Sequence, residues 1–574
     1  MEFNKNNLTP AGMNNLMTIE RGSRIYDEFQ KLSESPMEKN TEFLLKIIED
    51  SKDTEYGKKY DFANIHSVKD FQEKVPVTRY DDYIEYILRE TEDGEKNLLT
   101  SYNVVHYNKS SGTMGNPKRI PMSEKAVDIF NKYSTDYLNT LIAKNIGTDW
   151  IDERGMVTVE SADKVNYLKN GASFGALSVK SMIGARQMLS LIYTSPDEAT
   201  FPKPDTNTRY LHARFALMDK GTSSIGTSFF SFVAELLRYI EHNWKILVND
   251  IETGTIDPSI KMSDEVRESL AKKIKPMPER AAELKAIFEK GFDEPFVPKV
   301  WPKMSFLLGV GTGGFKTYAD LIKDKYMGDK IVQCKVGLNA SEGLFSIPFK
   351  MNCEDTVFVP DSVFYEFLPL DAEDDFSKIV TLDGVEVGKD YEVIITNTSG
   401  FYRYRMRDAV KITGKYNNIP TMQFLYRIDQ TVSIMGEKTT EVALRNAAEQ
   451  TAKDLEFELI DFSMYPDLDA VPVRYLYFME IGKMPEGLKP KEIRFVLDQN
   501  LAKANPSMGE KIKKGICGPT KLNILEPETY NLYRDLMLMK GVASGQLKPV
   551  RVISNEIQRK FFFTLTEYGV ELVK

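Results

Sequence analysis

The sequence has few of the residues and patterns on which several large classes of protein depend. Its three cysteines, Cys334, Cys353 and Cys517, stand far apart among 574 residues. They form neither a CxxC metal pair nor a disulfide framework, and they favour a reducing compartment. The four histidines are isolated, with no HExxH or other His-x-x-x-His pair. Zinc catalysis on paired histidines is therefore disfavoured.

The chain also lacks the apolar segments that a membrane requires. No run approaches the roughly 18 apolar residues that cross a bilayer, and residues 1–6 lack the basic and then apolar layout of a signal peptide. The formal net charge is −9, from 75 Lys and Arg against 84 Asp and Glu. Such a balance disfavours a general binder of nucleic acid. We expect a cytoplasmic protein with no membrane and no nucleic-acid partner.

Strand and helix patterns alternate over most of the chain, whose length allows up to about four domains. An antiparallel stretch is indicated from 357 to 427, and beyond 430 the pattern changes to a compact α+β module. The expected strands are 104–107, 304–308, 331–336, 357–367, 390–397, 410–414 and 473–481. The expected helices are 40–60, 80–89, 123–143, 229–237, 318–326, 440–455 and 491–504.

The loop from Ser110 to Lys118 carries the first chemical signal. Its hydroxyls and glycines offer compact hydrogen-bond donors and Lys118 adds a cation, a combination that suits a nucleotide polyphosphate. It is not a Walker A loop, because GxxxxGK[ST] is missing. From these residues alone, an ordinary Ser/Gly surface loop stays open as the alternative. A GxSxG elbow is absent as well, which argues against an α/β-hydrolase.

A second glycine loop, Gly309–Gly314, reads GxGxGG between an expected strand and an expected helix. This is the setting of a dinucleotide site, in which an acidic residue follows at about 20 residues. Here Glu342 lies more than 30 residues after Gly309. Taken alone, the loop therefore indicates either a dinucleotide site or a plain tight turn.

Four segments, in order, resemble signatures of the adenylate-forming enzymes, the superfamily of acyl-CoA synthetases, peptide-synthetase adenylation domains and luciferase. Residues 110–118 resemble the phosphate loop, and Leu338–Gly343 resembles the Tyr-Gly-x-Thr-Glu motif. Tyr402–Asp408 resembles the Tyr-x-x-Gly-Asp motif, and Leu425–Lys438 resembles the hinge between the large and small domains. A single match arises easily by chance, but several in a fixed order do not.

The surrounding residues are similar to one branch, the auxin-responsive Gretchen Hagen 3 family of acyl-acid amido synthetases. The similar segments include Asp70–Pro76, Ser399–Arg405 and Val410–Pro420, and Gln546–Arg551 resembles the family's Gln-x-Lys-x-Pro-Arg segment with the proline one place early. The likeness runs from about residue 36 to about 555 and is weakest between about 145 and 300. It implies that Gly311–Gly314 is a loop beside the adenine and acyl pocket, which retires the dinucleotide interpretation.

The resemblance implies an α/β fold of two parts. Residues 1–428 form a large domain of mixed sheets with flanking helices and a β-barrel-like portion. Residues 429–574 form a small, mobile α+β domain, with a hinge near 427–430. The implied enzyme is an ATP-dependent acid–amino acid ligase that adenylates a small carboxylic acid and transfers the acyl group to an amine. Its partners are ATP, the acid and the amine, Mg²⁺ is the cofactor, and a monomer is compatible with these features.

The resemblance also implies roles for individual residues. Lys548 steadies the attacking carboxylate and the α-phosphate, Lys438 contacts phosphate, and Glu342 binds Mg²⁺. The residues assigned to ATP and AMP are Ser110, Ser111, Gly112, Thr113, Lys118, Gly311, Thr312, Gly313, Leu338, Ser341, Asp408 and Arg427.

Three residues depart from the superfamily pattern. Met114 replaces a small or hydroxyl residue, Leu338 stands where an aromatic often packs on adenine, and Arg407 replaces the glycine before Asp408. Arg407 either tunes ATP binding or points to solvent.

Other functions stay open beside amide formation. The acceptor could be a thiol such as coenzyme A, the chain could be a non-catalytic nucleotide-binding homologue, and an oxidoreductase is the weakest alternative. The acyl pocket is expected to draw on residues 155–245, including Phe174, Phe229, Phe230 and Phe232, although these aromatic side chains fit an ordinary core equally well.

Overall fold

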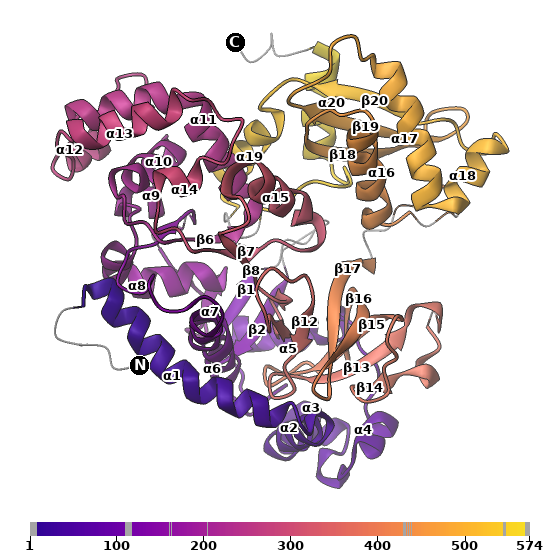
Figure 1. The fold of residues 1–574 in the computed structure, drawn as a ribbon. Coiled ribbons are helices and arrows are strands. Elements are labelled where there is room, and N and C mark those ends of the chain that lie inside the picture. The colour runs from indigo at the N-terminus through magenta and orange to yellow at the C-terminus, as the bar shows by residue number, and fades with distance from the viewer. Residues whose placement is uncertain are drawn as a thin grey trace.

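Strands and helices alternate as far as residue 427, and the chain then continues into a lobe drawn orange to yellow in Figure 1. This mixed α/β architecture agrees with the fold class expected from the sequence. The structure is a computed structural model. It describes residues 8–109, 118–159, 161, 164–203, 205–372, 374–428, 432, 434, 435, 437, 439–542 and 547–568.

A parallel sheet of four strands lies at the centre of the large body. Ile225, Leu307 and Cys334 are fully buried on three of its strands, as expected for a parallel sheet that helices cover. The strand order is β3 (Met156–Val157), β6 (Ser224–Phe229), β7 (Phe306–Val310) and β8 (Val332–Lys335). The loop that begins at Gly311 leaves the carboxyl end of β7, which is where ligands bind in open α/β sheets.

The strands on either side of the serine-rich loop belong to a second sheet. β1 (Val104–Lys109) pairs antiparallel with β2 (Arg119–Ser123), and β5 (Ser173–Gly175) pairs parallel with β1 on its other side. β4 (Asn166–Tyr167) completes the sheet at its edge. The two ends of the loop 110–117 are therefore held by paired strands.

The third sheet has seven antiparallel strands in an open order and covers the antiparallel stretch 357–427 expected from the sequence. The expected strand 357–367 is in fact two strands, because a turn at 359–363 divides it. The order is β11 (Ser346–Ile347), β12 (Thr356–Phe358), β17 (Ile419–Arg427), β16 (Tyr404–Tyr416), β15 (Asp390–Thr396), β13 (Phe364–Pro369) and β14 (Val380–Thr381). A separate small hairpin consists of β9 (Asn339–Ala340) and β10 (Gly343–Leu344).

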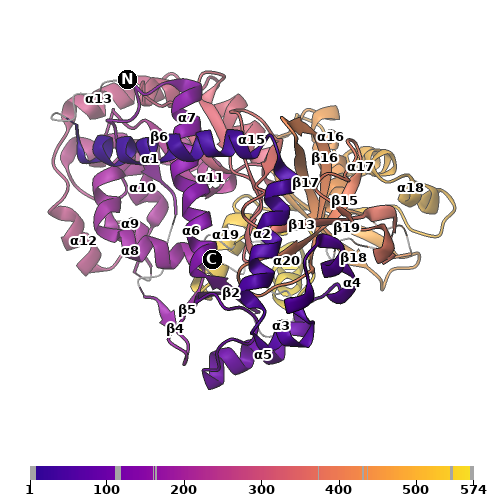
Figure 2. The same ribbon diagram turned by 90° about the horizontal axis from the view of Figure 1, so that it is seen from below.

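Helices flank these sheets. The first helix lies along the helical segment 124–146, where Arg21 pairs with Asp136 at 2.8 Å (Figures 1 and 2). That segment contains a π-helical stretch, Lys132–Tyr137, between α6 and α7. The helices of the body are α1 (Pro10–Leu32), α2 (Pro36–Ser51), α3 (Glu55–Lys59), α4 (Val68–Lys74), α5 (Ile84–Leu88), α6 (Glu124–Asn131), α7 (Leu138–Ile146), α8 (Leu177–Ile192), α9 (Asp197–Thr200), α10 (Thr208–Met218), α11 (Phe230–Thr253), α12 (Asp264–Ala271), α13 (Pro278–Phe288), α14 (Val297–Val300) and α15 (Lys316–Leu321).

The C-terminal lobe is an α+β unit, as the sequence pattern indicates. β18 (Leu459–Asp467) and β19 (Arg474–Ile481) are antiparallel, and β20 (Lys521–Leu525) joins β19 in parallel. The helices of the lobe are α16 (Glu441–Asp454), α17 (Pro490–Ala504), α18 (Pro506–Lys513), α19 (Thr529–Met539) and α20 (Glu556–Tyr568). Residues 429–431 lie outside the described residues, so the hinge stays a prediction.

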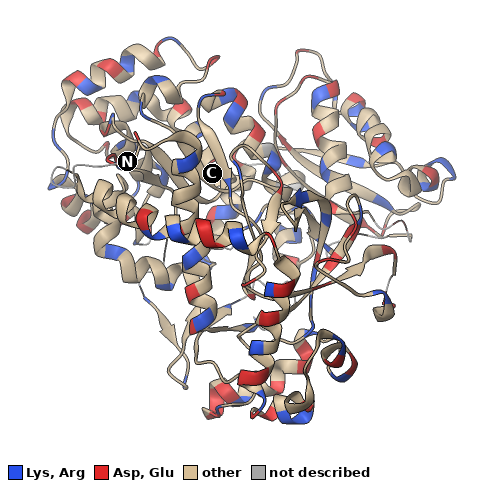
Figure 3. Ribbon diagram, turned by 60° about the horizontal axis from the view of Figure 1, so that its bottom comes forward, with Lys and Arg blue, Asp and Glu red and all other residues tan. Residues whose placement is uncertain are grey.

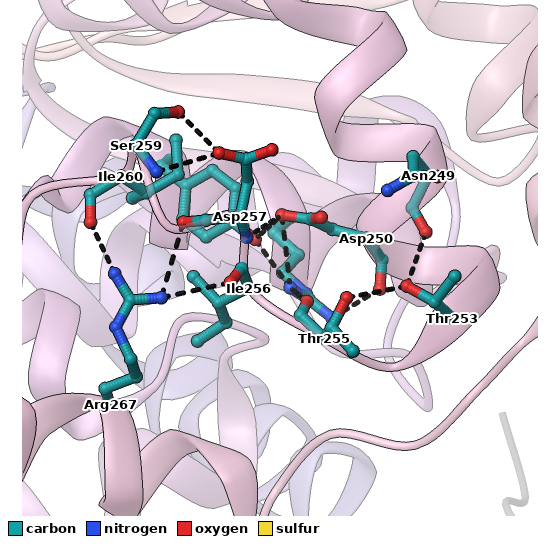
Figure 4. A network of polar contacts seen from close by, with 11 residues as sticks. Asn249, Asp250, Thr253, Thr255, Ile256, Asp257, Ser259, Ile260 and Arg267 are labelled. Carbon is teal, nitrogen blue, oxygen red and sulfur yellow. Dashed lines mark hydrogen bonds and ion pairs between the residues drawn. The ribbon is translucent and has the colours of Figure 1, made fainter.

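A polar network fixes the carboxyl end of α11 (Figure 4). The buried Asp250 carboxylate accepts a 2.6 Å hydrogen bond from the Tyr210 hydroxyl and a 2.8 Å bond from the Asp257 amide. Arg214, which is fully buried, lies 3.8 Å from the same carboxylate. Arg267 donates to the carbonyl of Ile260 at 2.7 Å, which ties α12 to the loop. Buried charges are thus paired, as their desolvation demands.

The surface carries charges of both signs. Figure 3 shows Lys and Arg interleaved with Asp and Glu along the helices. All three cysteines are free thiols. In the part of the chain that the structure describes, no helix combines the length and the apolar character needed to cross a membrane.

Candidate active site

Asp408 and Arg427 are direct cross-strand partners near one end of β16 and β17. Arg427 Nε donates to Asp408 Oδ1 at 3.0 Å. The Asp408 side chain is buried, whereas 41% of the Arg427 side chain stays exposed. The negative charge of Asp408 raises the pKa of Arg427, so the guanidinium is permanently charged at this site.

Glu342 lies in the turn of the β9–β10 hairpin, within electrostatic reach of that pair. Burial raises the pKa of the Glu342 carboxyl, and Asp408 adds to the rise, while Arg427 and Lys118 oppose it. The Tyr404 hydroxyl lies 3.5 Å from Glu342 Oε1. The Arg427 guanidinium nearby pairs with Asp408 instead, and among the described residues no Lys or Arg lies within 4.0 Å of the Glu342 carboxylate.

Two asparagines hold the backbone of this hairpin. Asn108, at the end of β1, donates to the Ser341 carbonyl at 2.8 Å. Asn397 donates to the Glu342 carbonyl at 2.9 Å. The strand that enters the serine-rich loop is thereby joined to the acidic motif. Neither asparagine was expected from the sequence, because a lone Asn in a strand carries no motif.

Lys118 extends from the end of the serine-rich loop toward the same region. Its Nζ lies 4.9 Å from the centroid of the Tyr80 ring, a cation–π distance. Its charge acts on the Glu342 carboxyl. The other predicted phosphate contacts, Ser110, Ser111, Gly112 and Thr113, lie outside the described residues.

The glycine loop after β7 is shaped by close packing. A Cβ atom on Gly311 would lie 2.4 Å from the Phe230 ring, so only glycine fits there. Gly313 has φ +59°, a left-handed conformation that favours glycine, and its carbonyl accepts a hydrogen bond from Arg445 of the C-terminal lobe. Thr312 lies half-buried between them.

Leu338 directly precedes the β9–β10 hairpin, and Ser341 lies in its turn beside Glu342. The Leu338 amide donates to Ser346 Oγ at 2.8 Å, and its half-buried side chain packs on the core of the body. Ser341 is held through its carbonyl by Asn108. Both residues border the carboxyl end of the parallel sheet.

Lys548 comes from the C-terminal lobe and faces the body of the protein. It keeps contact with solvent, but crowding by surrounding protein atoms lowers the pKa of its ammonium group, and Arg427 lowers it further. The carboxylates of Asp408 and Glu342 act in the opposite direction. The charges of the Glu342 hairpin, the Asp408–Arg427 pair and Lys548, which lie far apart in the sequence, thus act on one another. The other predicted lysine, Lys438, lies outside the described residues.

A cavity of about 190 Å³ lies beside the glycine loop and the acidic hairpin. Its lining carries no charged side chain among the described residues. It is bounded by the π-helical stretch, by β6 and β7, and by the hairpin segment. The apolar lining residues are Phe130, Tyr133, Leu138, Leu308, Val336, Leu344 and Ile347.

Phe174, Phe229, Phe230 and Phe232, the aromatic residues expected near an acyl pocket, are not among the described lining residues of this cavity. Phe230 is fully buried, and Phe229 stacks on Phe315 with ring centroids 4.4 Å apart. Phe232 is buried at the contact with the C-terminal lobe. The guanidinium group of Arg534, from the lobe, lies 4.5 Å from the centroid of the Phe232 ring. Phe174 packs against the core of the body. Phe229 and Phe230 thus belong to a core cluster, whereas Phe232 also lines a small pocket together with Lys548, so its part in an acyl pocket stays a prediction.

The backbone conformation at Arg407 is one that glycine adopts easily, which explains why the superfamily motif has a glycine at this position. Its φ is +59°, in the left-handed region. Its side chain turns to Glu392, with Nη1 to Oε2 at 3.4 Å. Glu392 also pairs with Arg405 at 2.6 Å, so Arg407 extends a buried ion-pair network.

Comparisons with known proteins agree with this architecture. Three family models match successive parts of the chain: the GH3 (Gretchen Hagen 3) family N-terminal domain at 25–332, the central domain at 356–427 and the C-terminal domain at 442–557. A probable indole-3-acetic acid-amido synthetase of Oryza sativa subsp. japonica is 27% identical, covering 94% of this chain and 95% of that protein. A 4-substituted benzoates-glutamate ligase of Arabidopsis thaliana is 26% identical, with 84% and 87% covered.

Among solved structures, the GH3.15 acyl acid amido synthetase superposes with a TM-score of 0.80 at 23% identity, covering 94% of this chain and 95% of that one. It shares the fold described above. Because the N-terminal family model alone spans more than half of the 574 residues, this chain belongs to the GH3 family.

Proposed function

We propose that this protein is an ATP-dependent acyl-acid amido synthetase. It adenylates a carboxylic acid, releasing pyrophosphate, and an amino acid or another amine then displaces AMP to form an amide. The observation that carries the proposal is the Arg427–Asp408 pair at 3.0 Å, with Glu342 3.5 Å from the hydroxyl of Tyr404 on the same strand as Asp408. An acid and ATP are both negative, so their reaction needs cations and donors at the point where they meet.

The adenosine end of ATP is assigned to the Asp408–Arg427 pair. A buried carboxylate that faces a fixed guanidinium suits the two ribose hydroxyls, because it accepts both hydrogen bonds. The phosphates are assigned to Lys118 and to the loop residues Ser110, Ser111, Gly112 and Thr113, with Lys438 reaching them from the lobe. Gly311, Thr312, Gly313, Leu338 and Ser341 are assigned to the rim of the adenine site.

Lys548 is proposed to stabilise the reacting centre. Its ammonium group would contact the attacking carboxylate and the α-phosphate, whose negative charge grows in the transition state. The Arg427 guanidinium lowers the pKa of the Lys548 ammonium group, and the Glu342 carboxylate raises it. Because Lys548 belongs to the lobe, this contact requires the lobe to lie against the body as it does here.

The donor set fits a magnesium ion bound with the nucleotide. Mg²⁺ is usually held by one or two carboxylates together with substrate phosphates. Glu342 supplies such a carboxylate without a described ion-pair partner, and no cluster of three or more His, Cys, Asp or Glu exists among the described residues. Glu342 would hold the ion, and the ion would offset charge on the polyphosphate. The three free thiols accord with action in the cytoplasm.

The apolar cavity is proposed to hold the body of the acid. It lies between the π-helical stretch and the segment of Leu338, so a ligand there would direct its carboxylate toward the acidic hairpin. The curated relatives are named for indole-3-acetic acid, jasmonoyl and 4-substituted benzoate reactions. An uncharged lining accords with an acid whose body is apolar.

The two-part organisation, 1–428 and 429–574 with a hinge near 427–430, is part of the same proposal. Rotation of the lobe after adenylation would remove Lys548 and admit the amine.

ATP–pyrophosphate exchange tests the first half of the reaction. The acids would be indole-3-acetate, jasmonate and 4-hydroxybenzoate, and acid-dependent exchange is the expected result. Twenty amino acids and coenzyme A would then be added separately, with amide or thioester identified by mass spectrometry. If the protein binds ATP but no acid supports ATP–pyrophosphate exchange, the proposal is contradicted. If only coenzyme A releases AMP from the acyl-adenylate, the second step is thioester formation and not amide formation.

A further inference from the structure

Asp461 joins the segment of Lys548 to the body of the protein. It is the first residue of a buried stretch of β18 and is itself buried. Its Oδ2 accepts a 2.5 Å hydrogen bond from the Tyr318 hydroxyl, which belongs to α15 of the body. Its Oδ1 binds the guanidinium of Arg551, three residues after Lys548.

On the lobe side, Arg551 is held in one position. It is buried, donates a second hydrogen bond to the Phe462 carbonyl at 2.9 Å, and lies 4.5 Å from the centroid of the Phe462 ring. The backbone is held too, because the Met464 amide donates to the Arg551 carbonyl at 2.9 Å and the Ile553 amide donates to the Met464 carbonyl at 2.8 Å. This segment therefore runs beside β18 without freedom to shift.

The connection from Arg551 back to Lys548 is short and stiff. Pro549 follows Lys548 directly, which restricts the Lys548 backbone to extended conformations. Val550 is buried, and its carbonyl accepts a hydrogen bond from Ser463. The position of Arg551 therefore largely determines the position of the Lys548 backbone.

On the body side, Tyr318 is equally constrained. Its side chain is buried, and it lies on the helix that directly follows the glycine loop 311–314. Burial and the adjacent Asp461 charge hold the pKa of the Tyr318 hydroxyl well above its ordinary value, so the group remains a donor. Asp461 accordingly bridges the loop beside the nucleotide site and the strand beside Lys548.

We infer that Asp461 and Tyr318 are positioning residues for adenylation. The Tyr318–Asp461–Arg551 chain holds the segment that carries Lys548 against the body when the lobe is in this orientation, and it must break when the lobe turns. The inference rests on the proposed function. A displacement of about 1 Å at a reacting group costs on the order of 100-fold in rate, so loss of this chain affects adenylation and spares amide formation.

The test separates the two half-reactions in Tyr318→Phe and Asp461→Asn. ATP–pyrophosphate exchange is expected to fall at least about tenfold in both variants, with the nucleotide dissociation constant unchanged. Conversion of added acyl-adenylate to amide is expected to stay within about threefold of the unmodified protein. Asp535→Asn is the matched control, since it breaks another contact across the same boundary, Arg209–Asp535 at 2.5 Å, without touching the Lys548 segment.

Hydrogen exchange of the peptide 547–553 provides a readout that needs no acyl substrate. Asp461→Asn is expected to speed exchange there while Asp535→Asn does not. Unchanged pyrophosphate exchange in Tyr318→Phe, or an equal loss in both half-reactions, would overturn the inference. So would equal effects of Asp461→Asn and Asp535→Asn on peptide 547–553. Failure of the proposed function is distinguishable, because the unmodified protein would then show no acid-dependent exchange at all.

Discussion

Arg427 and Asp408 face each other across β17 and β16, and Arg427 Nε donates to Asp408 Oδ1 at 3.0 Å. They lie 19 positions apart in the sequence, yet the antiparallel register makes them nearest neighbours on adjacent strands. A buried carboxylate held in this way is ready to accept hydrogen bonds without further reorganisation. The pair therefore defines where the nucleotide is expected to bind.

Asp408→Ala is expected to weaken ATP binding. Hydrogen bonds to a charged group contribute about 1.5–3 kcal/mol, which is on the order of 10- to 150-fold in the dissociation constant. Calorimetry with a non-hydrolysable ATP analogue measures the change. Asp355→Ala is the control, because its carboxylate binds Gln423 on the same strand β17 at 2.7 Å. Equal ATP affinity in the two variants would remove Asp408 from the nucleotide site.

Lys548→Ala is expected to lower the rate of pyrophosphate exchange by about 100-fold or more while nucleotide affinity changes little. The reason is that the proposed contacts of the ammonium group strengthen only in the transition state. Lys560→Ala, on the exposed face of α20, serves as the control. An exchange rate in Lys548→Ala equal to that of the control would end the assignment.

Arg407→Gly is expected to be more stable than Arg407→Ala by about 1 kcal/mol, because a side chain in the left-handed region costs about 1–2 kcal/mol. Both variants lose the contact with Glu392, so their difference isolates the backbone conformation at φ +59°. Urea denaturation midpoints provide the comparison. A more stable alanine variant would contradict this explanation of the glycine in the superfamily motif.

Ser134→Phe is expected to fill the apolar cavity, since Ser134 lines it from the π-helical stretch. The KM for the acid should rise by about tenfold or more, with the KM for ATP nearly unchanged. Ser190→Phe, on the exposed face of α8, carries the same change away from the cavity. Unaltered acid kinetics in Ser134→Phe would locate the acid elsewhere.

Asp250→Ala is expected to destabilise the body by about 3–5 kcal/mol, because it leaves the buried Arg214 without a carboxylate nearby. The Tyr210 hydroxyl loses its acceptor as well. Asp257→Ala removes a carboxylate whose hydrogen bonds come from the neighbouring Ser259, so a much smaller effect is expected. Thermal unfolding of both variants measures the difference, and similar midpoints would contradict the role of the network in Figure 4.

Local patterns indicated part of the elements. Apolar runs and helical periodicity indicated the parallel strands at 304–308 and 331–336 and the helix 440–455, because period and composition are properties of short segments. The expected strand 357–367 is two strands, since a turn inside an apolar stretch leaves little mark on composition. Helix 123–143 extends to 146 and contains a π-helical stretch that periodicity alone does not distinguish.

By itself, the sequence determined the family, the fold class and the positions of the motifs, because these follow from residue order along the chain. Only the tertiary structure decided which side chains meet. It brought Lys548 within electrostatic reach of Asp408 and Glu342, assigned Phe230 to the core and revealed Asp461 between Tyr318 and Arg551. These relationships depend on strand register and on how the lobe packs against the body, which arise from contacts between residues far apart in the chain.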